Sequence, residues 1–339
     1  MNKPPIPHIF GWLAFASLGL MPAILPGYLL FQVSIALTYA IAILGLNLVM
    51  GFNGQISLAQ GVFFAVGGYV VAILMTTCGL SFWTSLPLAI VAATVLGTLV
   101  GIPALRLQGL QLAITTIMLA AVVPPLILRL DKYTNGTSGL AIEKPEPPAW
   151  LPLSQDAYVY YICLAGVGVA ILIMLQLVRG DTGRRLRSVR DNPLIAEAFG
   201  VDVARTKVAA FAISAAFGGF AGGLFTLMNA FVSPDSFQLL KSFEFLAGGI
   251  IGGITSIAGA FVGALIVVFL PEWSAHISLS MAGIVYGGAL VTMMLIAREG
   301  VIGLLRTALS WISHRSGAKA HVLEREIAAQ DESQLSTSV

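Results

Sequence analysis

The residues of this chain best suited to recognising a solute are uncharged amides and hydroxyls set in an otherwise apolar sequence. One group, Asn53, Gln55, Ser57 and Gln60, lies in the glycine-punctuated segment 51–61, which leads into an apolar run. Polar atoms at membrane depth need hydrogen-bond partners or water. These side chains therefore predict either a path for a polar solute or hydrogen bonds between neighbouring helices, and the sequence alone leaves both open.

A second polar group, Thr255 and Ser256, lies at the middle of an apolar, glycine-rich region, residues 245–270. Such a region predicts one long helix or two short helices with a break between them, and irregular backbone at membrane depth survives only where it is buried in protein or lines a wet cavity. We assign Thr255 and Ser256 to the same candidate path. Glu244 and Glu272 flank the region and are interpreted as interfacial anchors or gating groups.

A third feature is a short, well-delimited helix in a charged segment. Asn192 suits an N-cap, Pro193 suits the first helical position, and Gly200 suits a left-handed end. The apolar residues between them share one face of the predicted helix. This stripe predicts a protein docking site, or alternatively a helix that lies on lipid headgroups or folds against its own loop. The candidate docking residues are Arg190, Asp191, Asn192, Pro193, Leu194, Ile195, Glu197, Ala198, Phe199 and Gly200.

Motifs for catalysis and metal binding are missing from the sequence. It contains no GxxxxGK[ST] phosphate loop, no HExxH and no cysteine pair at metal-ligand spacing. Cys78 and Cys163 lie in or beside apolar runs and are interpreted as free thiols. We therefore expect no catalytic residue, no metal site and no bound cofactor, and nothing in the formal net charge of +2 favours nucleic-acid binding.

The elements that must position these residues are membrane-spanning helices. Apolar residues make up 57% of the chain and charged residues 10%, and no Asp, Glu, Lys or Arg occurs between Lys3 and Arg106. A spanning helix needs about 20 apolar residues, and a charge at its centre costs roughly 2.5–3.5 kcal/mol. Charge-free runs therefore indicate spans, and the fold class is an all-α, polytopic transmembrane helical bundle.

The predicted bundle has about eight full spans plus a broken or re-entrant helix pair in 245–270, eight to ten crossings in total. The first run is longer than a signal-peptide core, so we expect it to remain as a span. The spans are 10–30, 31–50, 57–75, 84–105, 109–128, 157–178, 207–231 and 281–297.

Lysine and arginine near span ends set the topology. The segment 179–207 holds seven Lys/Arg residues and is predicted to be a cytoplasmic coupling loop, whereas 131–156 is predicted to be external. Both termini are predicted to be cytoplasmic, so 245–270 crosses an even number of times. Residues 1–312 form the predicted transmembrane permease domain, and 313–339 form a polar cytoplasmic tail.

Several motifs resemble one known family. They are Gly54-Gln55-Ile56-Ser57-Leu58 followed by Gly67-Gly68-Tyr69, then 134–140, then Arg190-Asp191-Asn192 through Gly200, then 233–237 and the glycines of 248–263. Together they cover roughly residues 37–297. The chain resembles the branched-chain amino-acid permeases of ATP-binding-cassette importers, in particular the M-type (LivM-like) subunits, with urea and amide permeases as near relatives.

The resemblance implies a permease subunit that carries branched-chain amino acids across the inner membrane as a multi-pass protein embedded in membrane lipid. It implies that the segment from Asn192 to Gly200 is a coupling helix that docks on a separate ATPase. The implied partners are a homologous second permease chain, two ATPase subunits that bind the ATP, and an extracytoplasmic solute-binding protein. Two alternatives stay open: a urea or short-amide permease of the same type, and an ATPase-independent channel or facilitator.

Overall fold

The computed structural model describes residues 18–107, 109–148 and 152–277, with 287–288, 291–292, 300–301 and 303. The predicted tail, 313–339, lies outside the described residues. So does most of the predicted last span, 281–297, and the first part of the predicted first span, 10–30.

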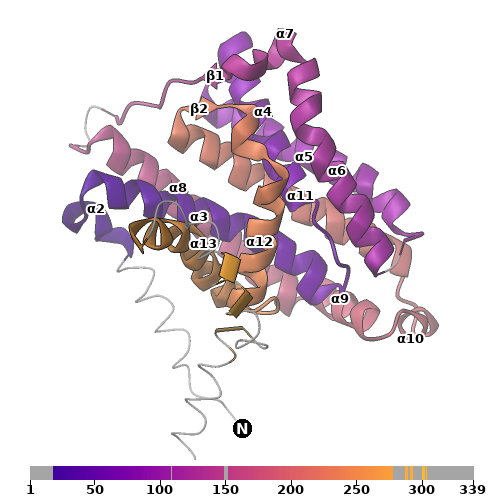
Figure 1. The fold of residues 1–339 in the computed structure, drawn as a ribbon. Helices are drawn as coiled ribbons and strands as arrows, with labels where there is room; N and C mark the ends of the chain where they lie inside the picture. Colours follow the sequence, from indigo (N-terminus) through magenta and orange to yellow (C-terminus); the bar gives the residue numbers. More distant parts are fainter. Residues whose placement is uncertain are drawn as a thin grey trace, which may run out of the picture.

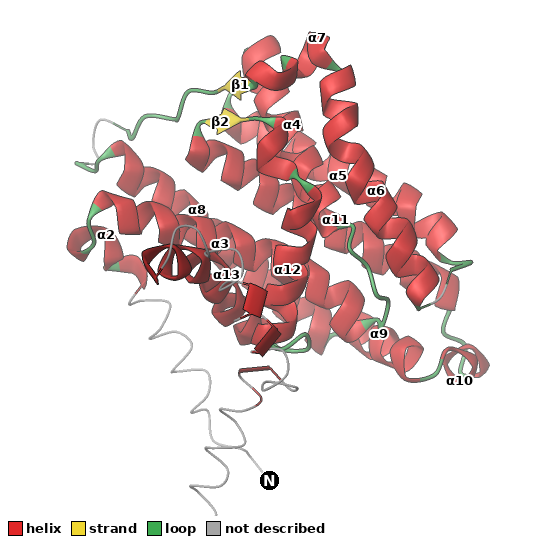
Figure 2. Cartoon of the chain, viewed as in Figure 1, coloured by secondary structure: helices red, strands yellow, loops and turns green. Residues whose placement is uncertain are grey.

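The described chain is almost entirely helical (Figures 1 and 2), with one two-stranded antiparallel ladder that pairs Leu140 with Val232 and Ala141 with Phe231. The elements are α2 (Met21–Ile24), α3 (Gly27–Asn47), η1 (Leu48–Phe52), α4 (Gln60–Thr77), α5 (Phe82–Ala104), α6 (Leu110–Arg129), α7 (Asp131–Thr134), η2 (Gly136–Ser138), β1 (Leu140–Ala141), α8 (Gln155–Arg179), α9 (Asp181–Asp191), α10 (Pro193–Ala198), α11 (Val203–Asn229), β2 (Phe231–Val232), η3 (Pro234–Phe237), α12 (Leu239–Gly252) and α13 (Ile257–Ile277).

Within the described residues, seven helices are long and apolar enough to cross a membrane. They are Gly27–Phe52, Gln60–Thr77, Phe82–Ala104, Leu110–Arg129, Gln155–Arg179, Val203–Asn229 and Ile257–Ser274. This confirms the predicted all-α, polytopic transmembrane bundle.

One predicted boundary is wrong. The sequence was divided into spans at residues 30 and 31, but a single helix runs continuously through that point from Gly27 to Phe52. The division falls at Pro26 instead, because proline disfavours helical geometry in the residue before it, and Leu25 is extended. The last turn of this span, η1, is a π-helix.

Helix α3 lies at the centre of the bundle, and α11 packs against α3, α4 and α5. Close approach of α11 to α4 depends on small residues at four-residue spacing, such as Gly218 and Gly222. A Cβ atom on Gly222 would collide with the backbone carbonyl of Phe64 on α4. Helices α5 and α6 instead present exposed apolar rows at four-residue spacing, which suits a lipid surface; these are Val91, Val95 and Leu99, then Ile114, Met118, Val122 and Leu126.

The glycine-rich region forms two helices with a break at residues 253–256, as predicted. Helix α12 has 14 residues, so it is about 21 Å long at 1.5 Å per residue and too short to cross a hydrocarbon core of about 30 Å. Its partner α13 has 21 residues and is not short. The two pack against each other through glycines, with no room for a Cβ on Gly252 or Gly263.

The two ends of the bundle are distinguished by what they carry (Figure 1). We call the end with α9, α10 and the segment 53–59 the α10 end, and the end with α7, β1 and β2 the β1 end. Helix α12 runs from the β1 side towards the α10 end, where Ile254 lies against Gly51. Helix α13 then returns, and Glu272 near its far end accepts a hydrogen bond from Tyr28 at the start of α3. The pair is therefore a hairpin inside the bundle.

Candidate functional site

Helix α10 begins and ends where the sequence predicts. The side-chain oxygen of Asn192 accepts hydrogen bonds from the backbone amides of Leu194 and Ile195, at 3.0 and 3.2 Å. At the other end, Gly200 has a φ of +80°. The backbone amide of Gly200 donates to the carbonyl oxygen of Glu197, and the amide of Val201 donates to the carbonyl oxygen of Ala196. This is the pattern of a Schellman motif. A cap at each end therefore holds this six-residue helix in place.

The apolar face of α10 is uncovered in this chain. Leu194 is 79% exposed and Phe199 is 84% exposed, and Ile195 and Ala198 are exposed as well. Only Ala196 of the helix is buried. The helix lies at the edge of the bundle (Figure 1). It thus presents large apolar side chains that the described chain leaves mostly uncovered, as a docking element does.

Helix α9 connects α10 to the interior. Arg190 donates from Nη1 to the carbonyl oxygen of Gly51 at 2.8 Å, and it also pairs with Asp191 at 3.2 Å. One turn earlier, the guanidinium of Arg187 lies 5.9 Å from the ring centroid of Phe52. Both arginines therefore hold α9 against the π-helical turn that ends the α3 span.

The predicted polar group follows that turn. Asn53, Gln55, Ser57 and Gln60 are all buried, with Asn53 at 2% and Gln60 at 1% exposed. The amide of Asn53 donates to the side-chain oxygen of Gln55, and the Ser57 hydroxyl accepts from the amide of Ala59. The side-chain oxygen of Asn53 has no hydrogen-bond partner although it is buried. A buried orphan acceptor is costly unless a donor arrives from outside the chain.

Gln60 is different from its neighbours because its amide is fully used. Its Nε2 donates to the backbone carbonyl of Ala42 on α3 at 2.8 Å, and its Oε1 accepts from the hydroxyl of Ser214 on α11 at 2.9 Å. These bonds join three helices. The arrangement favours the structural interpretation of Gln60 over a place on the path.

Ser256 and Thr255 lie at the break between α12 and α13. The Ser256 hydroxyl accepts a hydrogen bond from the backbone amide of Gly259 at 3.1 Å. The backbone carbonyl of Ser256 accepts one from the side-chain amide of Asn47, on α3, at 3.4 Å. Thr255 is exposed. The break thus lies directly against the end of α3, since a Cβ on Gly51 would collide with the carbonyl of Ile254. The structure therefore places the break beside the turn that Asn53 follows, whereas Gln60 is bonded to Ala42 and Ser214 instead.

A charged pair that the sequence pattern did not place at depth lies inside the bundle. Lys241 and Glu244, on the first turns of α12, form a 2.9 Å ion pair, and both side chains are mostly buried. Lys241 also lies 5.3 Å from the ring centroid of Tyr39, which stands at the middle of the span Gly27–Phe52. Glu244 is therefore not an interfacial anchor. The i,i+3 spacing of Lys and Glu between apolar residues was the available signal.

The segment before α12 explains why Lys241 and Glu244 lie deep in the bundle. Phe237, at the end of η3, packs 5.7 Å from Phe64 and 5.4 Å from Tyr69, measured between ring centroids. Both partners lie on the spanning helix α4. Since α12 begins two residues after Phe237, its first turn already lies within the bundle and not at the membrane surface.

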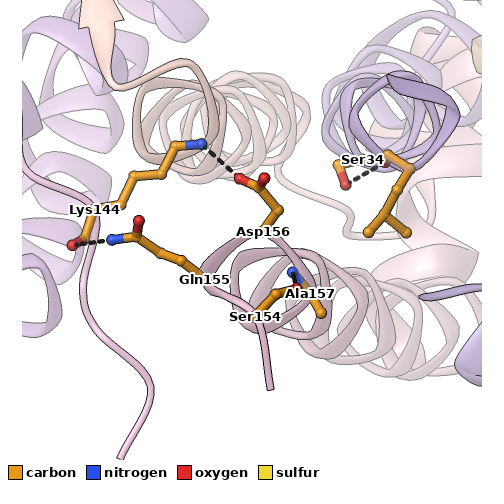
Figure 3. A network of polar contacts seen from close by, with 7 residues as sticks. Ser34, Lys144, Ser154, Gln155, Asp156 and Ala157 are labelled. Carbon is orange, nitrogen blue, oxygen red and sulfur yellow. Dashed lines mark hydrogen bonds and ion pairs between the residues drawn. The ribbon is translucent and has the colours of Figure 1, made fainter. Parts of the chain in front are cut away.

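At the β1 end, polar contacts fasten the long loop between α7 and α8 (Figure 3). Lys144 forms a 3.0 Å ion pair with Asp156, and Gln155 donates to the carbonyl of Lys144 at 3.1 Å. Ser154 caps α8 by accepting from the amide of Ala157. The same loop carries β1, which pairs with β2 just before η3 and α12. The loop is thus connected to the α12–α13 hairpin.

Spanning helices around the α12–α13 hairpin, with buried uncharged polar groups and an uncovered helix at one end, define a multi-pass membrane protein of the permease class. The family profile described as branched-chain amino acid transport system / permease component matches residues 28–301. The chain belongs to this family. It is therefore a multi-pass protein of the inner membrane and a permease component of a transport system.

Curated relatives agree with this assignment. The chain is 32% identical to the high-affinity branched-chain amino acid transport system permease protein LivM of Escherichia coli K12, over 81% of this chain and 70% of the relative. It is 28% identical to the autoinducer 2 import system permease protein LsrC of Enterobacter sp. 638, over 81% and 83%. It is 26% identical to a probable branched-chain amino acid transport permease protein LivH of Methanocaldococcus jannaschii, over 77% and 87%. No solved structure matches the chain.

Proposed function

We propose that this chain is a permease subunit of an ATP-binding-cassette importer that moves branched-chain or other hydrophobic amino acids inward across the inner membrane. Its similarity to LivM over most of both chains supports the amino-acid substrate. The observation that carries the coupling mechanism is the uncovered, doubly capped helix α10, which is held to the interior through Arg190 and Gly51.

The proposed complex contains a second, homologous permease chain, two ATPase subunits and an extracytoplasmic solute-binding protein. Permease components of both the LivM and the LivH type are among the relatives, which supports a pair of permease chains. ATP binds to the ATPase subunits, and this chain holds no cofactor of its own. The α10 end faces the cytoplasm together with both termini, because α9 and the residues around it carry the arginine cluster.

Coupling begins where Leu194, Ile195 and Phe199 dock in a groove of the ATPase. A large apolar side chain in a partner's pocket contributes most of the binding energy at such a contact. Movement of α10 is passed to α9, and Arg190 then pulls on the carbonyl of Gly51. Because Gly51 touches Ile254, the π-helical turn and the break between α12 and α13 move together. The interior therefore responds to the ATPase without large rearrangement of α3.

The β1 end receives the solute-binding protein. Its loop, 131–156, is braced by the Lys144–Asp156 ion pair, and its strand β1 is paired with β2. Docking there is communicated through β2 and η3 to the start of α12. Delivery from outside and closure from inside thus act on the same α12–α13 hairpin.

The coupling assignment is tested by replacing Glu197 and Phe199 together with alanine. In membrane vesicles that hold the complete importer, the variant should still reach the membrane, because both side chains are exposed. ATP-driven uptake should fall at least tenfold, since each 1.4 kcal/mol of lost docking energy is about a factor of ten. Leu110→Ala, an equally exposed apolar residue at the same end but outside α10, is the matched control. Unchanged uptake in the α10 variant contradicts the assignment.

A further inference from the structure

A cavity of about 470 Å³ opens beside the charged pair of α12. Its size lies in the range of about 300–1,000 Å³ that is typical of small-ligand sites. It is formed by the end of α11, by β2 and η3, and by the first turn of α12. Its lining residues are Phe225, Asn229, Phe231, Asp235, Ser236 and Lys241.

The cavity lies where a discontinuous helix starts inside the bundle. Lys241 reaches Tyr39 at the middle of the α3 span, while Phe231 belongs to the strand pair at the β1 end. The site therefore extends from the β1 end towards mid-depth. Ion pairs at this depth are expensive and mark substrate pathways, and transporter sites near the midplane are typically built at helix breaks.

The lining residues supply three kinds of contact: a cation, an anion and an apolar surface. Lys241 supplies a cation, and Asp235 supplies an anion that accepts one bond from Gln238 at 3.1 Å. Phe225 and Phe231 supply apolar surface. An ammonium has three N–H donors. Glu244 takes one of those on Lys241 and the side chain of Tyr39 takes a second, so one donor remains for a ligand.

Buried hydroxyls continue from this site along α4. The side-chain oxygens of Tyr69, Thr226 and Ser242 are buried without a hydrogen-bond partner. Thr226 lies against Gly68, and Ser242 lies against Gly61, two turns further towards the α10 end of α4. Orphan polar atoms are rare in protein interiors and call for an explanation. Thr226 and Ser242 directly follow the lining residues Phe225 and Lys241 in the sequence, so a polar solute that moves from the cavity along α4 would satisfy these atoms in turn.

We propose that this cavity is a substrate site for a zwitterionic amino acid with an apolar side chain. Lys241 binds the α-carboxylate, Asp235 binds the α-ammonium, and Phe225 and Phe231 contact the side chain. A neutral amide such as urea offers neither a carboxylate to the remaining donor of Lys241 nor an ammonium to Asp235, and a simple cation or anion offers only one of the two. This inference rests on the proposed transport of amino acids and names the residues that recognise them.

The test measures protection of a cysteine placed in the cavity. Ser236→Cys is introduced into the full chain together with Cys78→Ser, because Cys78 is exposed whereas Cys163 is buried. The protein is held in lipid nanodiscs, and the rate of modification by a methanethiosulfonate reagent is followed with and without ligand. Ser81→Cys, in a different cavity near the β1 end, is the matched control.

Leucine at millimolar concentration should slow modification of the cysteine at position 236 and leave the one at position 81 unchanged. Isoamylamine, which lacks the carboxylate, and 4-methylpentanoate, which lacks the ammonium, should each need roughly tenfold higher concentration for the same protection, the effect of one lost charge-assisted hydrogen bond. Urea should give none. No protection by leucine, or equal protection by urea, overturns the proposal.

Substitutions then test which group of the ligand Lys241 and Asp235 each bind. Lys241→Met is combined with Glu244→Gln, because removing one partner alone would leave a buried unpaired charge and endanger folding. This pair and Asp235→Asn should each raise the half-protecting leucine concentration roughly tenfold. In Lys241→Met/Glu244→Gln, leucine and isoamylamine should protect equally. A preference for leucine that persists in this variant contradicts the role of Lys241.

The failure of this site is distinguishable from failure of the proposed function. ATP-driven leucine uptake with no protection at position 236 would reject the site and keep the importer. Protection at position 236 by urea alone, with urea uptake, would reject the amino-acid substrate itself.

Discussion

Arg190 on α9 donates a hydrogen bond to the backbone carbonyl of Gly51, 2.8 Å away on the last turn of the α3 span. The two residues are 139 positions apart in the sequence, and no other described hydrogen bond joins α9 to η1. A glycine is needed at position 54, because a Cβ there would collide with the side chain of Arg190. Through Gly51, which lies against Ile254, the bond connects the uncovered helix α10 with the α12–α13 hairpin.

Replacing Arg190 with methionine should uncouple the importer. The variant loses the bond to Gly51 but keeps the apolar stem of the side chain, so we expect ATP hydrolysis by the complex to continue while uptake falls several-fold. Both rates are measured in the same vesicles. Arg184→Met is the control on the same helix, because Arg184 pairs only with Asp181 at the surface. If the two variants have the same ratio of uptake to ATP hydrolysis, the contact between Arg190 and Gly51 does not couple the two.

Gly51→Ala should destabilise the chain. The added methyl group has no room against the carbonyl of Ile254, and overpacking of this kind costs typically about 1–3 kcal/mol. Thermal unfolding of the detergent-solubilised protein, followed by tryptophan fluorescence, reports the change. Gly27→Ala provides the comparison, since nothing lies within 4 Å of a Cβ at that position. Unfolding of both variants at the wild-type temperature would contradict the close packing of Gly51 against Ile254 at the helix break.

Ser214→Ala should lower stability without changing which solute is carried. It leaves the buried Oε1 of Gln60 without its donor, a loss of about 1–3 kcal/mol. The measurement is again thermal unfolding, with uptake of competing solutes as the second readout. A changed solute preference at unchanged stability would instead place Gln60 on the translocation path.

Asn192→Ala should fray α10. The side chain caps two backbone amides, and loss of an N-cap costs about 0.5–2 kcal/mol. Hydrogen exchange at Leu194 and Ile195 should become faster, and the rates in α11 should stay unchanged. Asn192→Ser, which preserves a capping oxygen, should restore slow exchange. Rapid exchange at both amides already in the wild-type chain would contradict the capped helix.

The elements that the sequence predicted well are those set by strong local signals. Charge-free apolar runs indicated the spans, and Asn192, Pro193 and Gly200 delimited α10 because capping depends on few neighbouring atoms. The break near Ser256 followed from glycines and hydroxyls in an apolar region. The boundary at residue 30 failed because hydropathy is uniform there, and only the conformational effect of Pro26 separates the helices.

The site was predictable only in part, because depth and pairing depend on tertiary contacts. Gln60 and Asn53 look alike in the sequence, yet Gln60 is bonded to two other helices and Asn53 keeps an orphan oxygen. Lys241 was missed because hydropathy places charges at interfaces. Its true depth follows from Phe237, whose packing on α4 draws the start of α12 into the bundle.

The most direct test of the whole account is uptake of labelled leucine, with labelled urea in parallel, by vesicles that hold this chain together with its co-encoded ATPases, second permease and solute-binding protein. The account predicts leucine uptake that requires both ATP and the binding protein, and no uptake of urea. Flux of either solute without ATP, or uptake of urea alone, would contradict it.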